Sequence, residues 1–139
     1  MLKYSNLALA QIQDLAAELA TDLAGKKAVI GLVGNLGSGK TTFVKAFAKQ
    51  LKINKISSPT FVITHQYPLG KRSLYHLDFY RLKNSKQLIS LGLDEILAGP
   101  NLVLIEWVDK FPAFQRQCDI LISLKVKPDN KRDVTIQNI

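Results

Sequence analysis

Residues 34–43, GNLGSGKTTF, have the composition and spacing of a loop that binds phosphate groups. They fit the pattern G-x-x-x-x-G-K-[ST], with Lys40 and Thr41 at its last two positions. Glycines let the backbone wrap closely around an anion, and N–H groups then point inward at the positive end of the following helix. In such loops the lysine contacts the β- and γ-phosphates and the hydroxyl ligates Mg²⁺. The predicted nucleotide contacts are Gly34, Asn35, Leu36, Gly37, Ser38, Gly39, Lys40, Thr41 and Thr42.

Two acidic residues further along the chain are candidates for catalysis together with Lys40. Glu106 ends the apolar run LVLIE, so a core strand would deliver it to the carboxyl edge of a sheet, where ligands bind in α/β proteins. Glu106 would bind Mg²⁺, directly or through water, and help orient an attacking water. The alternative for Glu106 is a solvent-facing glutamate at a strand end. Asp78, in HLDFYR, is the second candidate, with a turn or capping acid as the alternative.

Several other residues carry weaker signals. Thr60 or Ser58, in SPTF, would serve as a switch ordered by the γ-phosphate and Mg²⁺, or else belong to an ordinary turn. His76 is more typical of a structural histidine than of a catalytic one. Trp107 is either a core aromatic or an exposed contact residue. Cys118 is expected to be a small buried hydrophobe, because no base or second thiol accompanies it.

Placing these residues at one site requires a particular order of helices and strands. Periodicity and turn residues predict a strand at 2–4, a helix from an N-cap at Ser5 to Gly25, a buried strand within 27–34, a helix at 40–52, a hairpin from 57–69 and 73–80, one or two short helices in 88–97, a buried strand at 102–106, and an antiparallel pair at 119–126 and 133–139 joined by 127–132. The strand before the loop and the helix after it argue against a chance match to a glycine-rich turn. The order predicts an α/β fold, a single P-loop NTPase-like domain over 1–139, with a central mixed sheet flanked by helices.

Composition indicates the class of protein and its surroundings. The chain has 139 residues, 47% hydrophobic and 22% charged, as expected for one globular domain. A single cysteine cannot form an internal disulfide, and no apolar run approaches the ~20 residues of a membrane span. Polar residues such as Gln11 and Asp14 interrupt any leader-like apolar segment, so we expect a cytoplasmic protein with no membrane partner. The net charge of +8 favours a polyanion or an acidic partner; the alternative is a generally basic surface.

Five segments together resemble the TsaE (YjeE) family of small bacterial ATPases: GNLGSGKTTF (34–43), SPTFVI (58–63), YHLDFYRL (75–82), LGLDEIL (91–97) and LIEW (104–107). The phosphate loop alone is common, but its combination with SPTF, H-x-D-x-Y-R and IEW is highly specific. The resemblance spans most of the chain and implies a role in making threonylcarbamoyladenosine beside the anticodon of tRNAs that read codons beginning with A. It implies that the chain binds ATP and Mg²⁺, joins TsaB and TsaD, and hydrolyses ATP to reset them, with tRNA contacted mainly through the complex.

The resemblance also assigns roles to individual positions: Lys40 and Thr41 to phosphate and Mg²⁺, Glu106 to the metal site, Asp78 to the active site, Thr60 to a switch-like segment, Trp107 to the nucleotide site, and Arg132 and Ser5 to the side of the base. Two departures from the family pattern stand out. Asn35 replaces the aspartate that usually follows the first loop glycine, which removes a negative charge near the phosphates. Val108 and Asp109 replace the usual Pro-Glu after IEW, so the role of that glutamate is in doubt here.

Three functions are therefore considered. The main hypothesis is an ATPase that is slow alone and activated by its partner proteins. A small-molecule kinase would need an acceptor pocket and a lid, for which little chain remains. A nucleotide-gated RNA-binding module, suggested by the +8 charge, would bind tRNA by itself in a strongly salt-dependent way. Preference for ATP over GTP rests on the resemblance, because the chain has no clear N-K-x-D guanine signature.

Overall fold

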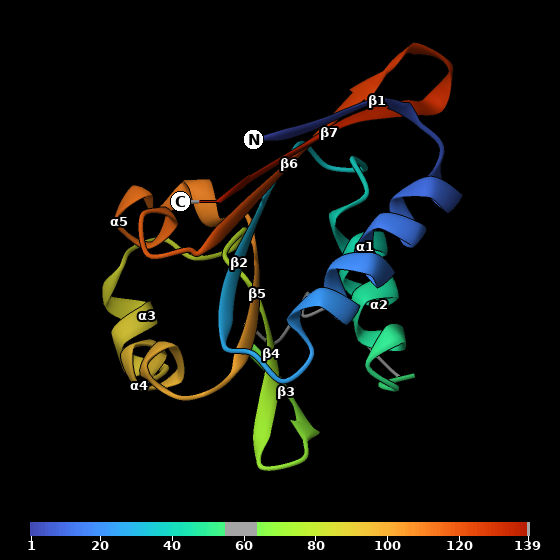
Figure 1. Ribbon diagram of the computed structural model, residues 1–139. Helices are drawn as coiled ribbons and strands as arrows, with labels where there is room; N and C mark the ends of the chain where they lie inside the picture. Colours follow the sequence, from blue (N-terminus) through green and yellow to red (C-terminus); the bar gives the residue numbers. More distant parts are fainter. Residues whose placement is uncertain (55–63, 139) are drawn as a thin grey trace.

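A seven-stranded mixed sheet runs through the centre of the computed structural model, which describes residues 1–54 and 64–138 (Figure 1). Its strands are β1 (Leu2–Leu7), β2 (Ala28–Val33), β3 (Thr64–Leu69), β4 (Arg72–Asp78), β5 (Leu102–Glu106), β6 (Ile120–Lys127) and β7 (Lys131–Asn138), in the spatial order β1-β7-β6-β2-β5-β4-β3. β2 is parallel to β5 and β6, and β4 is parallel to β5. The pairs β1–β7, β6–β7 and β3–β4 are antiparallel. The predicted α/β class with a mixed central sheet is confirmed.

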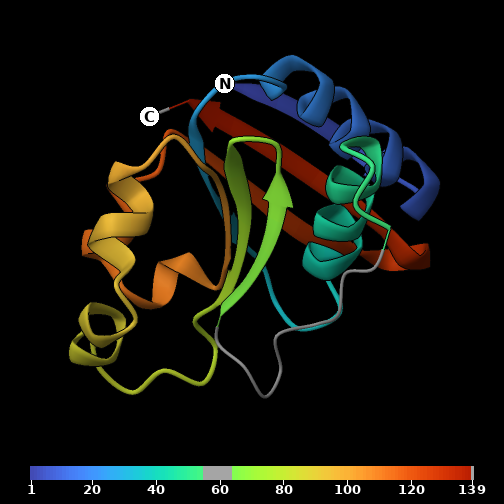
Figure 2. The ribbon, with the colours of Figure 1, turned by 90° about the horizontal axis from the view of Figure 1, so that it is seen from below.

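Helices cover both faces of this sheet. α1 (Leu9–Leu23) and α2 (Lys40–Gln50) lie together on one face. The other face carries α3 (Lys86–Ser90), α4 (Leu93–Ala98), α5 (Pro112–Gln115) and the 3₁₀ turn η1 (Val108–Lys110), while the 3₁₀ turn η2 (Pro128–Asn130) joins β6 to β7. Figure 2, which looks at the molecule from below, shows the two groups of helices on opposite sides of the strands. Among the described residues, no helix has the length and apolar character needed to cross a membrane.

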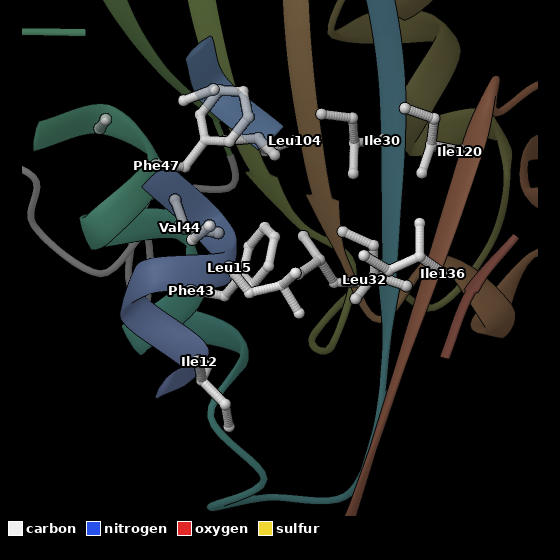
Figure 3. Packing of buried hydrophobic residues seen from close by; sticks show 14 of the residues in the cluster. Ile12, Leu15, Ile30, Leu32, Phe43, Val44, Phe47, Leu104, Ile120 and Ile136 are labelled. Carbon is white, nitrogen blue, oxygen red and sulfur yellow. The ribbon is translucent and has the colours of Figure 1, made fainter. Parts of the chain in front are cut away.

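The core between α2 and the sheet fixes where the phosphate loop ends. Phe43, Val44 and Phe47 project from one side of α2 and are fully buried against strand residues such as Ile30 and Leu32 (Figure 3). Burying a side chain of this size stabilises the fold by about 1.5–3 kcal/mol. Because the first residue of α2 is Lys40, this packing holds the positive end of the helix at the carboxyl end of β2.

Gly31, in the middle of β2, has no room for a side chain. A Cβ atom at this position would lie 2.6 Å from Val108 Cγ1 and 2.9 Å from Cys118 Sγ. We expect Gly31→Ala to lower the free energy of unfolding by about 1–3 kcal/mol, the usual cost of overpacking a core. Urea denaturation would measure it. In a Val108→Ala background the same change should cost less, because the nearest atom is gone; strictly additive losses would contradict this explanation.

The prediction that Ser5 caps the first helix is wrong. Ser5 lies inside β1, and α1 begins at Leu9 after the N-cap residue Ala8, whose N–H donates to Gln11 Oε1 at 2.8 Å. Pairing with β7 extends β1 to Leu7, beyond the predicted 2–4, and the Asn6 N–H donates to Asp133 Oδ1 at 3.0 Å. These contacts with residues far along the chain outweigh the local preference of serine for a helix start.

The other elements follow the predictions closely. The strands within 27–34 and at 102–106, the helix at the phosphate loop and the C-terminal antiparallel pair are all confirmed. The segment 88–97 is indeed two short helices, divided at Gly92, which has φ 72°. β6 and β7 extend into the predicted connection, so the turn between them is only 128–130 rather than 127–132. The predicted hairpin is confirmed from Thr64 onward; its first residues lie outside the described part of the chain.

Candidate functional site

The phosphate loop connects β2 to α2 and depends on glycine at two positions. Gly39 has φ 109°, which L-residues with a side chain rarely adopt, and it immediately precedes α2. A Cβ atom on Gly34 would lie 2.6 Å from the backbone oxygen of Leu124, so only glycine allows this close approach. The Ser38 N–H closes the turn by donating to the Asn35 oxygen at 3.0 Å. The loop is thus a tight backbone turn that ends at a helix N-terminus, the geometry that binds anions.

Lys40 is held inside this loop. Its side chain is 5% exposed, and Nζ donates to the backbone oxygens of Gly34 and Asn35, the latter at 3.0 Å. Nζ also lies 4.2 Å from the centroid of the Trp107 ring, within range of a cation–π interaction. Burial lowers the pKa of Lys40, and the carboxylates of Glu106, Asp78 and Asp109 oppose this shift. The loop therefore places a buried amine at the N-terminus of α2, close to several acidic side chains.

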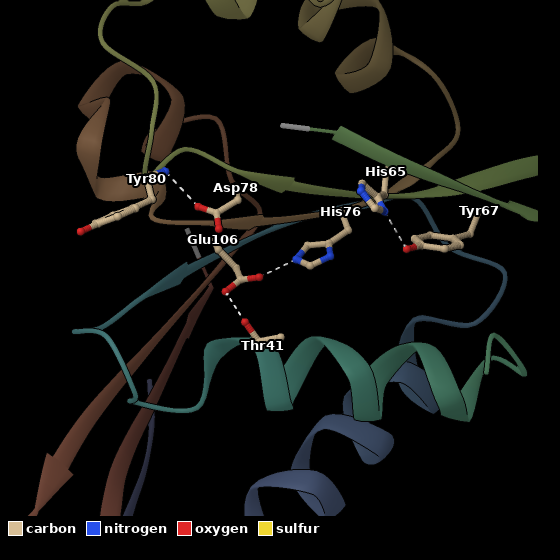
Figure 4. A network of polar contacts seen from close by, with 7 residues as sticks. All are labelled: Thr41, His65, Tyr67, His76, Asp78, Tyr80 and Glu106. Atoms are coloured by element: carbon tan, nitrogen blue, oxygen red, sulfur yellow. Dashed lines mark hydrogen bonds and ion pairs between the residues drawn. The ribbon is translucent and has the colours of Figure 1, made fainter. Parts of the chain in front are cut away.

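Glu106 is the centre of a buried hydrogen-bond network (Figure 4). It is 3% exposed and ends β5. Its Oε1 accepts a hydrogen bond from Thr41 Oγ1 at 3.0 Å, and its Oε2 lies 2.5 Å from His76 Nε2. The carboxylate therefore links α2, through Thr41, to β4, through His76. The alternative of a solvent-facing glutamate is wrong, since the interior of the fold encloses this side chain.

Asp78 lies beside Glu106 on the neighbouring strand, because the parallel register of β4 and β5 pairs the two residues. Its Oδ1 accepts the backbone N–H of Tyr80 at 2.9 Å, so Asp78 does make the turn contact that was its alternative role. Burial raises the pKa of Asp78; the negative charge of Glu106 adds to this shift, whereas the Tyr80 N–H, His76 and Lys40 oppose it. The site thus contains two adjacent carboxyl groups close to one lysine.

The alternation of side chains along β4 and β5 explains why these groups meet. Leu74 and Leu102, at the beginning of the two strands, belong to the core beneath α1 and α2. Residues two and four positions later share that face, which brings His76, Asp78 and Glu106 to the carboxyl end of the sheet. His76, which the sequence favoured as a structural histidine, is the buried partner of Glu106. Its period-two spacing from Asp78 is the one signal in the sequence, because it indicates that the two side chains share one face of the strand.

Trp107 is half-buried, between the two alternatives that the sequence left open. Its backbone N–H donates to the Leu32 backbone oxygen at 3.0 Å, and its φ is 59°, so the chain turns sharply after Glu106. The centroid of its ring lies 4.9 Å from that of Tyr80. The ring thus forms one wall of the site, between Lys40 and the exposed Tyr80.

Arg132, on β7, holds the phosphate loop through hydrogen bonds to its backbone oxygens. It is buried in β7, and its guanidinium donates to the oxygens of Ser38 at 3.3 Å, Gly37 at 3.2 Å and Asn130 at 2.7 Å. These contacts hold loop carbonyls on the β7 side. Ser5 is exposed on β1, the strand next to β7. The assignment of both residues to the side of a base stays a prediction.

The remaining predicted residues divide into two groups. Asn35, Leu36, Gly37 and Thr42 lie in or directly after the loop, with Leu36 exposed at its tip (69%). Ser58 and Thr60, the predicted switch residues, lie outside the described part of the chain. The structure therefore brings together the loop, Lys40, Thr41, Asp78, Glu106, Trp107 and Arg132.

The oxygen groups of the site suit Mg²⁺ better than a softer metal. Thr41 supplies a hydroxyl and Glu106 a carboxylate, with a second carboxylate on Asp78 nearby. Within residues 1–54 and 64–138, no group of three or more His, Cys, Asp or Glu side chains could hold a metal ion by itself. In nucleotide sites, phosphate oxygens and water complete the coordination of Mg²⁺.

Comparison with known proteins gives one consistent result. Residues 7–134 match the family model described as "Threonylcarbamoyl adenosine biosynthesis protein TsaE". The tRNA threonylcarbamoyladenosine biosynthesis protein TsaE of Bacillus subtilis is 39% identical over 120 residues, which cover 86% of this chain and 75% of the relative. The protein of the same name from Aquifex aeolicus is 38% identical over 125 residues, covering 88% and 85%. The crystal structure of Bacillus subtilis YdiB aligns with a TM-score of 0.75 at 32% identity, covering 99% of this chain and 85% of that one.

Proposed function

The chain belongs to the TsaE family and has its P-loop NTPase-like fold and its role in threonylcarbamoyladenosine biosynthesis; on this premise we propose that it is a Mg²⁺-dependent ATPase that drives the turnover of a TsaB–TsaD complex. The observation that supports hydrolysis most is the buried contact between Thr41, at the start of α2, and Glu106, at the end of β5. It unites the two elements that a P-loop ATPase uses to hold metal and water.

Each residue of the site has a part in this proposal. The loop N–H groups and Lys40 bind the phosphates and offset negative charge on the β- and γ-oxygens. Thr41 and Glu106 would hold Mg²⁺, which when bound neutralises charge on those same oxygens. Glu106 or Asp78 orients the attacking water. Trp107 closes the side of the site next to Lys40.

Exposed apolar groups at the rim of the site support a role for partner proteins. Leu36, at the tip of the loop, is 69% exposed, and Tyr80, whose ring lies next to that of Trp107, is 46% exposed. Aromatic side chains such as tyrosine are enriched where another protein docks. We propose that TsaB–TsaD covers this rim and completes the site, that hydrolysis resets the pair, and that most tRNA contact belongs to these partners.

One cavity among the described residues lies on the wrong face of the sheet to serve as an acceptor pocket for a kinase. This cavity of about 450 Å³, lined by residues that include Tyr75, Glu95 and Asn101, lies between the β3–β4 hairpin and α4. Tyr75 belongs to the core under α3 and α4, whereas Glu106 contacts α2 on the opposite face. An acceptor bound in this cavity would have the sheet between itself and Lys40.

The proposed function is tested by counting rounds of tRNA modification. TsaB–TsaD, threonylcarbamoyl adenylate and tRNA would be mixed with or without the chain and ATP. We expect many modified tRNAs per complex only with the chain and ATP, and about one round with a non-hydrolysable analogue, since without hydrolysis the pair is not reset. Equal yields with ATP and the analogue would contradict a role for hydrolysis.

A further inference from the structure

We propose that His76 is a positioning residue that fixes the carboxylate of Glu106 for metal binding, an inference that rests on the proposed function. His76 makes no direct contact with the phosphate loop among the contacts described above. Its action would pass through Glu106, whose Oε2 lies 2.5 Å from His76 Nε2. Neither the resemblance nor the spacing of the motifs assigned this role to it.

The hydrogen-bond geometry defines which atom of the histidine acts. A carboxylate that binds metal is ionised and only accepts hydrogen bonds, so the proposal places the hydrogen of the imidazole on Nε2, facing Glu106 Oε2. The other carboxylate oxygen, Oε1, accepts from Thr41 Oγ1 at 3.0 Å. Glu106 is therefore held by one donor on β4 and one on α2. With both oxygens engaged, rotation about the terminal bond of the glutamate is restricted.

The backbone of Glu106 is equally constrained. The Phe79 N–H donates to its oxygen at 3.0 Å, and the next residue, Trp107, donates to the Leu32 oxygen at 3.0 Å. The strands on both sides of β5 thus fix the main chain, and His76 and Thr41 fix the side chain. Outer groups of this kind orient the ligands of metal sites and set their affinity.

A purely structural role explains His76 less well. The side chain is completely buried, and within the described residues its Nδ1 has no hydrogen-bond partner. A buried nitrogen without a hydrogen bond lowers the stability of the fold. An apolar side chain at this position would avoid that cost and would extend the buried core to which Leu74, two residues earlier on the same face, belongs. The polar group is therefore better explained by what it does for Glu106.

The test compares variants that keep or remove the donor. Trp107 is the chain's one tryptophan and follows Glu106 directly, so its fluorescence would report Mg²⁺ titrations of protein saturated with a non-hydrolysable ATP analogue. We expect His76→Leu to raise the half-saturating Mg²⁺ concentration by about 10–100-fold, the usual effect of removing an outer partner of a metal ligand. His76→Gln, whose amide can reach Glu106, should recover most of the loss. Analogue binding in EDTA should be unchanged in both.

If His76→Leu does not fold, a comparison of two polar variants, His76→Asn and His76→Gln, still tests the inference. His76→Asn is polar but too short to reach Glu106, so it should behave like His76→Leu, not like His76→Gln. Equal Mg²⁺ dependence in the wild type, His76→Asn and His76→Gln would overturn the inference, as would a matching loss of analogue binding in EDTA. A wild-type protein that shows no Mg²⁺-linked binding would instead contradict the proposed function itself.

Discussion

Lys40→Ala is expected to lower partner-stimulated ATP turnover by about 100–1000-fold, the range seen when a donor aimed at developing charge is removed from an enzyme site. Lys40 is buried at the N-terminus of α2 and is the residue that the loop pattern assigns to the β- and γ-phosphates. Its amine now bonds loop oxygens of Gly34 and Asn35, so it is already within reach of an anion bound by that loop. Phosphate release at saturating ATP would measure the effect.

Lys45→Ala provides the matched control. It removes the same charge from the same helix, but Lys45 is exposed and lies more than one turn away. We expect this variant to keep its turnover and its thermal unfolding midpoint. If both variants lost activity to the same degree, the effect would belong to the net charge of α2 and not to the phosphate site.

Glu106→Gln is the second change with a large expected effect. Glutamine keeps the shape of the side chain and one acceptor oxygen, but it removes the negative charge that would bind Mg²⁺. It also sets an amide N–H₂ group against either the Thr41 hydroxyl, which donates to Glu106, or His76 Nε2, to which the proposal above assigns the same role. We expect turnover to fall by about 100-fold or more, because metal placement and water orientation are lost together.

The measurement for this variant should separate metal from nucleotide. ATP binding in EDTA should remain close to that of the wild type, since the loop and Lys40 are intact, while the Mg²⁺ dependence of turnover should be lost. Glu18→Gln, a neutralised glutamate exposed on α1, is the control and should behave like the wild type. Normal Mg²⁺ dependence in Glu106→Gln would move the metal site elsewhere, with Asp78 as the next candidate.

The parts of the fold that sequence predicted well are those specified by nearby residues. The phosphate loop, the buried strand before it and the strand ending at Glu106 each follow from a short pattern. Cys118 is likewise the buried small hydrophobe that was expected: it is 3% exposed, and burial raises its pKa to about 12. These features depend on periodicity and local composition, which a single sequence displays directly.

The parts that sequence could not supply depend on pairing between distant segments. Ser5 was assigned to a helix start because its partner strand, β7, is more than a hundred residues away. The contact of Arg132 with the loop carbonyls has the same origin, since it requires the order β7-β6-β2 in the sheet. The bond between His76 and Glu106 needs the register of β4 against β5, which no local pattern encodes.

Steady-state phosphate release from ATP, by the chain alone and with TsaB–TsaD, would decide whether this site belongs to a partner-gated ATPase. We expect slow release by the chain alone and strong stimulation by the partners, lost in both Lys40→Ala and Glu106→Ala. Formation of the complex would be verified for each variant, so that a loss of turnover can be distinguished from a failure to bind TsaB–TsaD. Equal rates with and without bound partners, or full stimulation in either variant, would contradict a partner-gated ATPase built on this site.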